Sequence, residues 1–266
     1  MKVIDAHLHF SQAIPEFAEQ AQAVGQEYTE AHLRAEFARL GIECGVVMGN
    51  GGLGLEEHAY PDFLRYCIGL DSNGESPEEI LPEQLEAHLK RPQCVGIKLY
   101  PGYCHHYVSD PMYAPVYELA QQYDKPVAIH TGSTAGGMGR LKYSHPLTVD
   151  DAASEFPGVR FVLCHFGNPW VQDAAAVMEK NANVFADLSG LLEGRTDAAS
   201  LFRQETDYLN YVRLWMGYAG GWERLMYGTD FPLVNLEEYL TFAQRLVPER
   251  YHEAVFRDTA RAVYGL

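Results

Sequence analysis

Short apolar runs rich in β-branched residues recur along the whole chain, and their rhythm leaves few folds open. Runs of this kind, without strict alternation, are typical of parallel strands that are buried on both faces. We predict eight strands, at Val3–His9, Gly45–Met48, Tyr66–Asp71, Val95–Tyr100, Pro126–Thr131, Arg160–Phe166, Asn183–Leu188 and Leu225–Asp230.

Segments with helical periodicity separate these runs. The predicted helices are Thr29–Leu40, Pro82–Lys90, Tyr113–Tyr123, Val149–Phe156, Trp170–Lys180, Leu236–Leu246 and Glu249–Tyr264. Strands that alternate with helices indicate an α/β fold, and about 250 residues is the usual size of a (β/α)8 TIM barrel. Because no linker or shift in composition divides the 266 residues, we expect residues 1–266 to form a single barrel domain.

Two stretches between predicted elements are longer than a simple connection requires. They are Gly132–Pro146, after the fifth strand, and Ser189–Asp207, after the seventh. Loops that follow the strands of a TIM barrel build its active site. We therefore expect these two insertions to form part of the active site.

The negative net charge argues against anionic binding partners. Lysine and arginine number 20 against 36 aspartate and glutamate residues, and the net charge of -16 would repel phosphate backbones and anionic lipid surfaces. We expect a small-molecule substrate, no nucleic acid and no membrane, whereas the sequence leaves homo-oligomer formation open. No leader or membrane span is indicated, and the five cysteines lack paired spacing, so we expect a cytoplasmic protein.

Side chains suited to a metal site stand at the ends of several predicted strands. His7 and His9 are two residues apart on the first strand, so both imidazoles point to the same side. His130, His165 and Asp230 end the fifth, sixth and eighth strands. Barrel enzymes place catalytic groups at this end, and buried ionisable groups are costly there unless they are paired or bind a metal.

The ordered set of motifs resembles the amidohydrolase superfamily. It comprises Asp5-Ala6-His7-Leu8-His9, the fifth-strand histidine, the sixth-strand histidine with Gly167-Asn168-Pro169-Trp170, and Gly228-Thr229-Asp230-Phe231-Pro232. The similarity is greater to the amidohydrolase-related branch that contains aminocarboxymuconate semialdehyde decarboxylase and pyrone dicarboxylate lactonase. This resemblance implies that His7, His9, His130 and Asp230 hold one divalent ion, usually zinc, with manganese as the alternative, and that His165 is a catalytic acid or base.

Two reactions are compatible with these residues. Zinc with an open coordination position lowers the pKa of its water to about 7, which favours hydrolysis of an ester, lactone or amide with Asp230 and His165 as catalytic groups. The alternative is nonoxidative decarboxylation of a small unsaturated or aromatic carboxylic acid. We favour hydrolysis because Lys98, on the fourth strand, could complete a hydrolytic metal centre. A barrel that binds metal without turnover is a third reading.

Three further residues are candidate substrate-binding groups. The strand period turns Lys98 and Tyr100 into the barrel, and Arg140 belongs to the loop after the fifth strand. An inward lysine must pair with a carboxylate, bind an anionic substrate or be carboxylated to bridge two metal ions. Arg140 could receive a substrate carboxylate or could be a solvated surface charge.

The segment Gly49–Gly54 offers a rival interpretation. It matches G-x-G-x-x-G after a strand, and Asp71 follows about twenty residues later, as in nicotinamide-dependent oxidoreductases. The helix that should begin within these glycines is short, however, and Pro61 interrupts it. We therefore regard the oxidoreductase as a remote alternative.

Overall fold

The computed structural model describes residues 1–266 except 12–13, 51, 71–81 and 220. All eight predicted strands are present, and several of them are shorter than predicted. They are β1 Val3–Leu8, β2 Ile42–Met48, β3 Leu64–Leu70, β4 Cys94–Leu99, β5 Val127–Ile129, β6 Phe161–Leu163, β7 Val184–Asp187 and β8 Leu225–Met226. Asp71, at the predicted end of the third strand, lies outside the described residues.

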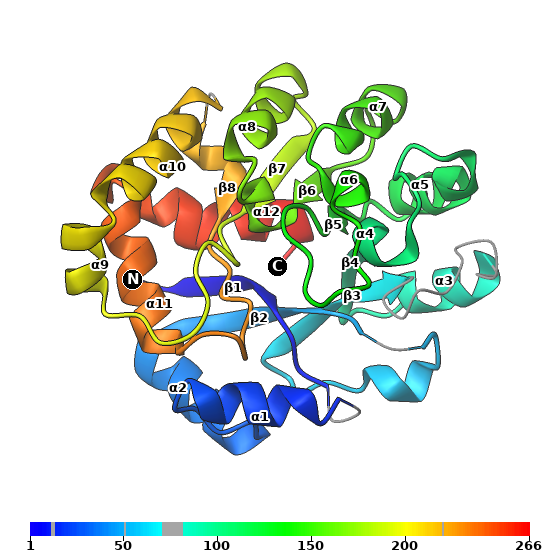
Figure 1. Cartoon of the computed structure of the whole chain (residues 1–266). Coiled ribbons are helices and arrows are strands. Elements are labelled where there is room, and N and C mark those ends of the chain that lie inside the picture. The colour runs from blue at the N-terminus through cyan, green and yellow to red at the C-terminus, as the bar shows by residue number, and fades with distance from the viewer. Residues whose placement is uncertain (12–13, 51, 71–81, 220) are drawn as a thin grey trace.

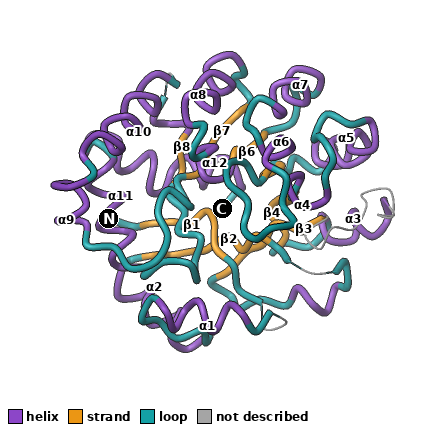
Figure 2. The backbone as a smooth tube through the Cα atoms, viewed as in Figure 1, coloured by secondary structure: helices purple, strands orange, loops and turns teal. Residues whose placement is uncertain are grey.

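The strands form one parallel sheet in the order β1 to β8, and the sheet curls into a barrel. The seam between β8 and β1 is closed by hydrogen bonds from Ala6 N to Tyr227 O (2.9 Å) and from His9 N to Phe231 O (2.7 Å). Figure 1 shows the helices as an outer ring around the strands, and Figure 2 shows the same arrangement by secondary structure. The fold is therefore the predicted (β/α)8 TIM barrel.

Six predicted helices agree with the structure to within one residue at each end. Capping residues explain the agreement in helix α2, because the Thr29 side chain accepts a hydrogen bond from His32 N at its start and Gly41 ends it with a φ of 73°. The helices are α1 Glu16–Ala23, α2 Glu30–Leu40, α3 Pro82–Leu89, α4 Pro101–Cys104, α5 Ala114–Gln122, α6 Leu141–Ser144, α7 Thr148–Glu155, α8 Val171–Lys180, α9 Ala198–Gln204, α10 Thr206–Tyr218, α11 Leu236–Leu246 and α12 Thr259–Tyr264.

Helices α1 and α10 were not predicted, and their burial explains why. Helix α1 buries a single residue, Ala21, so it has no apolar stripe. Helix α10 buries Leu209, Val212 and Met216 but exposes Tyr211, Leu214 and Tyr218. Apolar residues on both faces remove the one-sided pattern by which amphipathic helices are recognised.

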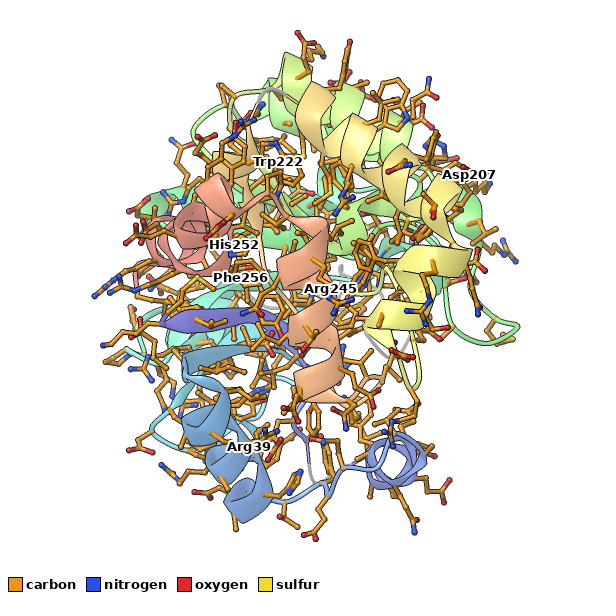
Figure 3. All side chains as sticks on the ribbon, turned by 90° about the vertical axis from the view of Figure 1, so that its left-hand side faces the viewer. Arg39, Asp207, Trp222, Arg245, His252 and Phe256 are labelled. Carbon is orange, nitrogen blue, oxygen red and sulfur yellow. The ribbon has the colours of Figure 1, made fainter. Side chains whose placement is uncertain are left out.

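The prediction of one continuous helix over Glu249–Tyr264 was wrong. The structure divides this segment into a 3₁₀ turn at Glu249–Tyr251, a π-helical turn at Ala254–Asp258 and helix α12. One carbonyl of the π-helical turn bonds outside the helix, because Val255 O accepts a hydrogen bond from Tyr227 N of the barrel at 2.8 Å. The rings of His252 and Phe256 contact each other at 5.2 Å, and Trp222 stacks on Tyr251. Figure 3 shows His252 and Phe256 in this segment with Trp222 nearby.

Helix α12 plugs the interior of the barrel. Ala260, Val263 and Tyr264 pack in one buried cluster with inward side chains of the strands, such as Ile4 and Val95. This end of the barrel is thereby filled with apolar side chains. The polar side chains that end the strands lie at the opposite mouth.

The glycine-rich segment does not lead into a helix of the dinucleotide-binding type. After Gly54 the chain makes only the 3₁₀ turn Leu55–His58 before it enters β3. The anion-binding helix N-terminus of that fold is therefore missing at this point. Among the described residues, no helix has the length and apolar character that a membrane crossing requires.

Candidate active site

A cavity of about 520 Å³ opens where the strands end at their carboxyl termini. The two predicted insertions contribute to it, through Ser133 and Ala135 after β5 and through residues 190–193 after β7. Most of the side chains predicted as site residues line this one cavity: His7, His9, Lys98, Tyr100, His130, His165 and Asp230.

His7, His9 and Asp230 converge on one point within the cavity. Asp230 Oδ1 lies 3.4 Å from His7 Nε2 and 3.2 Å from His9 Nε2. These three groups can offer a metal ion one ligand atom each, all within 4.8 Å of one another. His7 Nε2 and Asp230 Oδ1 are both buried without a hydrogen-bond partner, which is costly unless a cation satisfies them.

The outer contacts of the two imidazoles determine where their hydrogens lie. His7 Nδ1 faces the Asp187 carboxylate at 2.9 Å, and His9 Nδ1 faces the Met48 carbonyl at 3.0 Å. Both partners accept hydrogen bonds only, so each Nδ1 carries a hydrogen and each Nε2 faces inward. Although burial alone would lower it, the Asp187 charge raises the pKa of His7 well above its usual value, so a cation bound between these groups would take the place of the proton on Nε2.

His130 and His165 belong to a second chain of polar contacts. The contacts join Asp187 Oδ1 to Ser189 Oγ (2.5 Å), Ser189 Oγ to His165 Nδ1 (2.9 Å), His165 Nε2 to His130 Nδ1 (3.2 Å) and His130 Nε2 to the Ser133 carbonyl (2.9 Å). Acceptors end the chain on both sides, so its four contacts need four hydrogens. Neutral Ser189, His165 and His130 supply only three, one each.

An added positive charge would complete this chain, and burial disfavours a proton in that role. Burial lowers the pKa of His165 to about 4, although the Asp230 charge opposes the shift. Burial, together with the charge of His165, also holds the pKa of His130 well below its usual value. Neutral rings are the form of histidine that binds metal ions.

Local backbone conformations aim two of these side chains into the cavity. His165 has a φ of 63° and Asp230 a φ of 61°, in the left-handed region that non-glycine residues rarely adopt. Hydrogen bonds hold both conformations, from His165 N to Asp187 Oδ1 (3.0 Å) and from Asp230 N to the His7 carbonyl (2.8 Å). Strain of this kind is typical of functional sites.

Asp187, Ser189 and Asn50 are site residues that the sequence analysis missed. Asp187 is fully buried and contacts His7 through one oxygen and Ser189 through the other. Asn50 lines the cavity, with its Oδ1 2.5 Å from His9 Nδ1. Asp187 ends the seventh strand, so the strand-end reasoning that identified Asp230 could have found it. Asn50 follows a strand in a glycine-rich loop and carried no comparable signal.

Asp187→Asn is expected to weaken metal binding without removing a ligand. The carboxylate accepts the Nδ1 hydrogen of His7 and so fixes the ring with its Nε2 lone pair inward. Loss of such a partner usually costs about 10- to 100-fold in metal affinity. Competition with a chromophoric chelator measures the effect, with Asp173→Asn, a carboxylate outside the cavity lining, as the matched control. An affinity within a factor of about two of the parent would contradict this role for Asp187.

Lys98 and Tyr100 reach the cavity from β4, as the strand period predicted. Lys98 is fully buried and its Nζ donates a hydrogen bond to Cys164 Sγ at 2.7 Å. The Tyr100 hydroxyl donates to the Gly49 carbonyl at 2.8 Å and accepts from Asn50 Nδ2 at 3.1 Å. Tyr100 therefore joins the end of β4 to the loop that contacts His9.

Arg140 lies apart from the other predicted site residues. It is exposed, it immediately precedes helix α6, and it is not among the described residues that line the cavity. Its backbone N–H donates to the Gly102 carbonyl at 2.8 Å, which fixes the start of α6 outside the cavity. The structure thus brings Arg140 to the surface of the loop and not to the cluster of His7, His9 and Asp230.

The fold and the site define a barrel with a cluster of candidate metal ligands at its mouth, and comparison with known proteins identifies its family. The sequence model of the family described as amidohydrolase matches residues 4–266. The chain belongs to the amidohydrolase family. Among curated protein sequences, none matches this chain.

Several solved structures share the fold over the whole chain. An uncharacterized TIM-barrel protein from Bordetella bronchiseptica is 19% identical with a TM-score of 0.74, covering 100% of this chain and 99% of the other. A zinc-bound amidohydrolase from Burkholderia multivorans is 16% identical with a TM-score of 0.72, covering 100% of both chains. A probable 2-pyrone-4,6-dicarboxylic acid hydrolase from Acinetobacter baumannii, with citric acid bound, is 15% identical with a TM-score of 0.68 and the same coverage.

Decarboxylases also share this architecture. A 5-carboxyvanillate decarboxylase from Novosphingobium aromaticivorans, complexed with manganese, is 13% identical with a TM-score of 0.62, covering 100% of this chain and 96% of the other. Identities this low establish the common fold. They leave the reaction to be argued from the site itself.

Proposed function

We propose that this protein is a metal-dependent hydrolase that acts on a small-molecule ester, lactone or amide through a metal-activated water. The observation that carries the proposal is the pair of buried, unpartnered atoms His7 Nε2 and Asp230 Oδ1, which face each other across 3.4 Å. A divalent cation between them would satisfy both atoms. Hydrolytic metal chemistry requires that such an ion keep one position for water.

We propose that His7, His9, His130 and Asp230 hold a single ion. His7, His9 and Asp230 form one ligand group, and the inward lone pair of His130 Nδ1 is the fourth candidate donor. Imidazoles with one carboxylate suit zinc, with manganese as the alternative. When bound, the ion would act as a Lewis acid and lower the pKa of a coordinated water.

The residues around the ligands suit proton transfer in hydrolysis. His165, with its pKa of about 4, is neutral at physiological pH and can accept a proton through Nε2. Ser189 holds the other ring nitrogen at 2.9 Å and orients it. Although burial alone would raise the pKa of Asp230, its close contacts with the His7 and His9 imidazoles hold that pKa well below its usual value. Asp230 is therefore an ionised carboxylate, which can bind a cation and accept a proton.

Decarboxylation is the second candidate, and one observation favours keeping it. The ligand set and a neutral histidine would serve equally in a decarboxylase, and decarboxylases of aromatic acids share the fold. In that reaction the substrate carboxylate leaves as carbon dioxide, and a proton delivered by His165 or Asp230 takes its place.

Turnover in ¹⁸O-labelled water is expected to separate the two reactions. Lactones, esters, amides and small aromatic or unsaturated carboxylic acids are screened while released carbon dioxide is monitored. Because hydrolysis adds the oxygen of water to the carbonyl, we expect ¹⁸O in the product and no carbon dioxide. Mass spectrometry of the product measures this. Carbon dioxide release with an unlabelled product would establish decarboxylation and reject our preference.

A further inference from the structure

Lys98 presents a buried amine to the cavity. Its side chain is fully buried, its Nζ lies 2.7 Å from Cys164 Sγ, and the Tyr100 ring centroid is 5.1 Å away. Among the described residues, no carboxylate forms an ion pair with this amine. An ammonium has three donors, and a thiol and an aromatic face leave at least one of them for a ligand. Burial of such a group is expensive, so an anion that enters the cavity would offset a large cost.

The number of cations around the cavity limits how many anionic groups it can accept. Lys98 is the one lysine or arginine among the described residues that line it. The segments outside the description add none, because the sequence has no lysine or arginine at positions 12–13, 51, 71–81 or 220. Glu193 lines the mouth as well and would repel a second negative group.

The other cationic side chains of the mouth loop do not add to this count. Arg140 is exposed outside the cavity lining. Lys142 lies 4.5 Å from the ring centroid of Tyr143 and 6.0 Å from that of Tyr107, so it is engaged at the surface. Neither residue is placed to neutralise a ligand inside the cavity.

Much of the remaining wall is apolar or aromatic, and the polar side chains of Gln20, Asn50, Ser133 and Asn168 interrupt it. Phe17 approaches the His9 ring at 5.4 Å, and Tyr103 approaches the His130 ring at 5.2 Å. Leu191 and Leu233 complete a lining that suits a flat hydrocarbon body. A cavity of about 520 Å³ has room for a monocyclic or bicyclic ligand.

We propose that Lys98 anchors the single carboxylate of a substrate with an aromatic or similarly apolar body, and that the site discriminates against acids with further carboxylates. This inference rests on the proposed function, because it takes the cavity to be the active site, and it concerns how the substrate is bound. A second carboxylate in this cavity would be desolvated without a cationic partner other than the metal ion. The site would then discriminate through the unpaired charge of the second carboxylate and not through the size of the ligand.

The test is calorimetric titration of the zinc-loaded protein with benzoate, isophthalate and benzamide. We expect benzoate to bind at least tenfold more tightly than isophthalate, which adds one carboxylate, and than benzamide, which has no charge. Lys98→Met should weaken benzoate binding at least tenfold and leave benzamide binding unchanged. Lys142→Met is the matched control and should change neither affinity.

Metal content and thermal unfolding of each variant accompany the titrations. Methionine replaces a buried charge with an apolar chain of similar length, so we expect Lys98→Met to keep its ion and its melting temperature. Isophthalate binding as tight as benzoate, or benzoate binding that Lys98→Met leaves unchanged, would overturn the proposal. Loss of bound metal in Lys98→Met would also overturn it, in favour of a carboxylated lysine that bridges ions. If Lys98 governs benzoate binding but no ester, lactone or amide is hydrolysed, the anchor stands and the proposed reaction fails.

Discussion

Exchange of both His7 and His9 for alanine is expected to abolish metal binding and turnover together. The two rings supply two of the three ligand atoms that lie within 4.8 Å of one another, and the remaining proposed ligands, His130 and Asp230, are too few to retain an ion against water. Elemental analysis should find about one equivalent of zinc or manganese in the parent protein and none in the variant. We expect activity to fall to background, because the metal would supply the activated water.

A matched control separates this effect from a general loss of histidine. His32 on helix α2 hydrogen-bonds Gln26 and is not among the cavity-lining residues, so His32→Ala should keep both ion and activity. Added zinc should not restore the double variant. A purified, fully active parent protein without a transition metal would contradict the mononuclear mechanism. Two equivalents that both depend on Lys98 would favour the binuclear alternative.

His165→Asn is expected to lower kcat/KM by about 10² to 10⁴, the usual range for loss of a general acid or base. His165 is the neutral, buried imidazole that Ser189 orients beside His130. Asparagine can still hydrogen-bond Ser189 but cannot accept a proton from a reacting group. Steady-state kinetics measure the loss, and elemental analysis should show that the ion remains.

A histidine outside the cavity provides the control for this substitution. His145 lies in the loop after β5 and contacts Asp173 and Trp170, and it is not among the described residues that line the cavity. His145→Asn should therefore leave kcat/KM within a factor of about two of the parent. Turnover unaffected by His165→Asn would remove this residue as acid or base from hydrolysis and from decarboxylation alike.

The local pattern of the sequence was sufficient to predict the barrel. Eight apolar runs separated by helical segments require a parallel sheet with covered faces, and strands such as β4 and helices such as α11 lie where the pattern placed them. The site was predictable as far as strand periodicity reaches. Period two turned His7, His9 and Lys98 to one side of their strands, and the cavity contains all three.

Elements without a one-sided apolar pattern could not be predicted in this way. Helix α1 buries only Ala21, yet its Phe17 lies against His9 and forms a wall of the site. The segment 249–264 has an apolar periodicity that suggests one helix, but the structure has a π-helical turn at its centre, where Val255 O accepts a hydrogen bond from Tyr227 N of the barrel. Contacts with the rest of the molecule, which local propensity does not include, decided both cases.

Sequence by itself therefore determined the fold and the set of chemical groups at the strand ends, because both depend on local periodicity. Tertiary structure alone decided which of these groups meet. Barrel closure brings Asp187 of β7 against His7 of β1, and that contact orients the inward lone pair of the ring. The path of the loop after β5 carries Arg140 to the surface, while Lys98 lies buried without a carboxylate partner among the described residues. These distances depend on how all eight strands curl around one axis, and no single segment specifies that curvature.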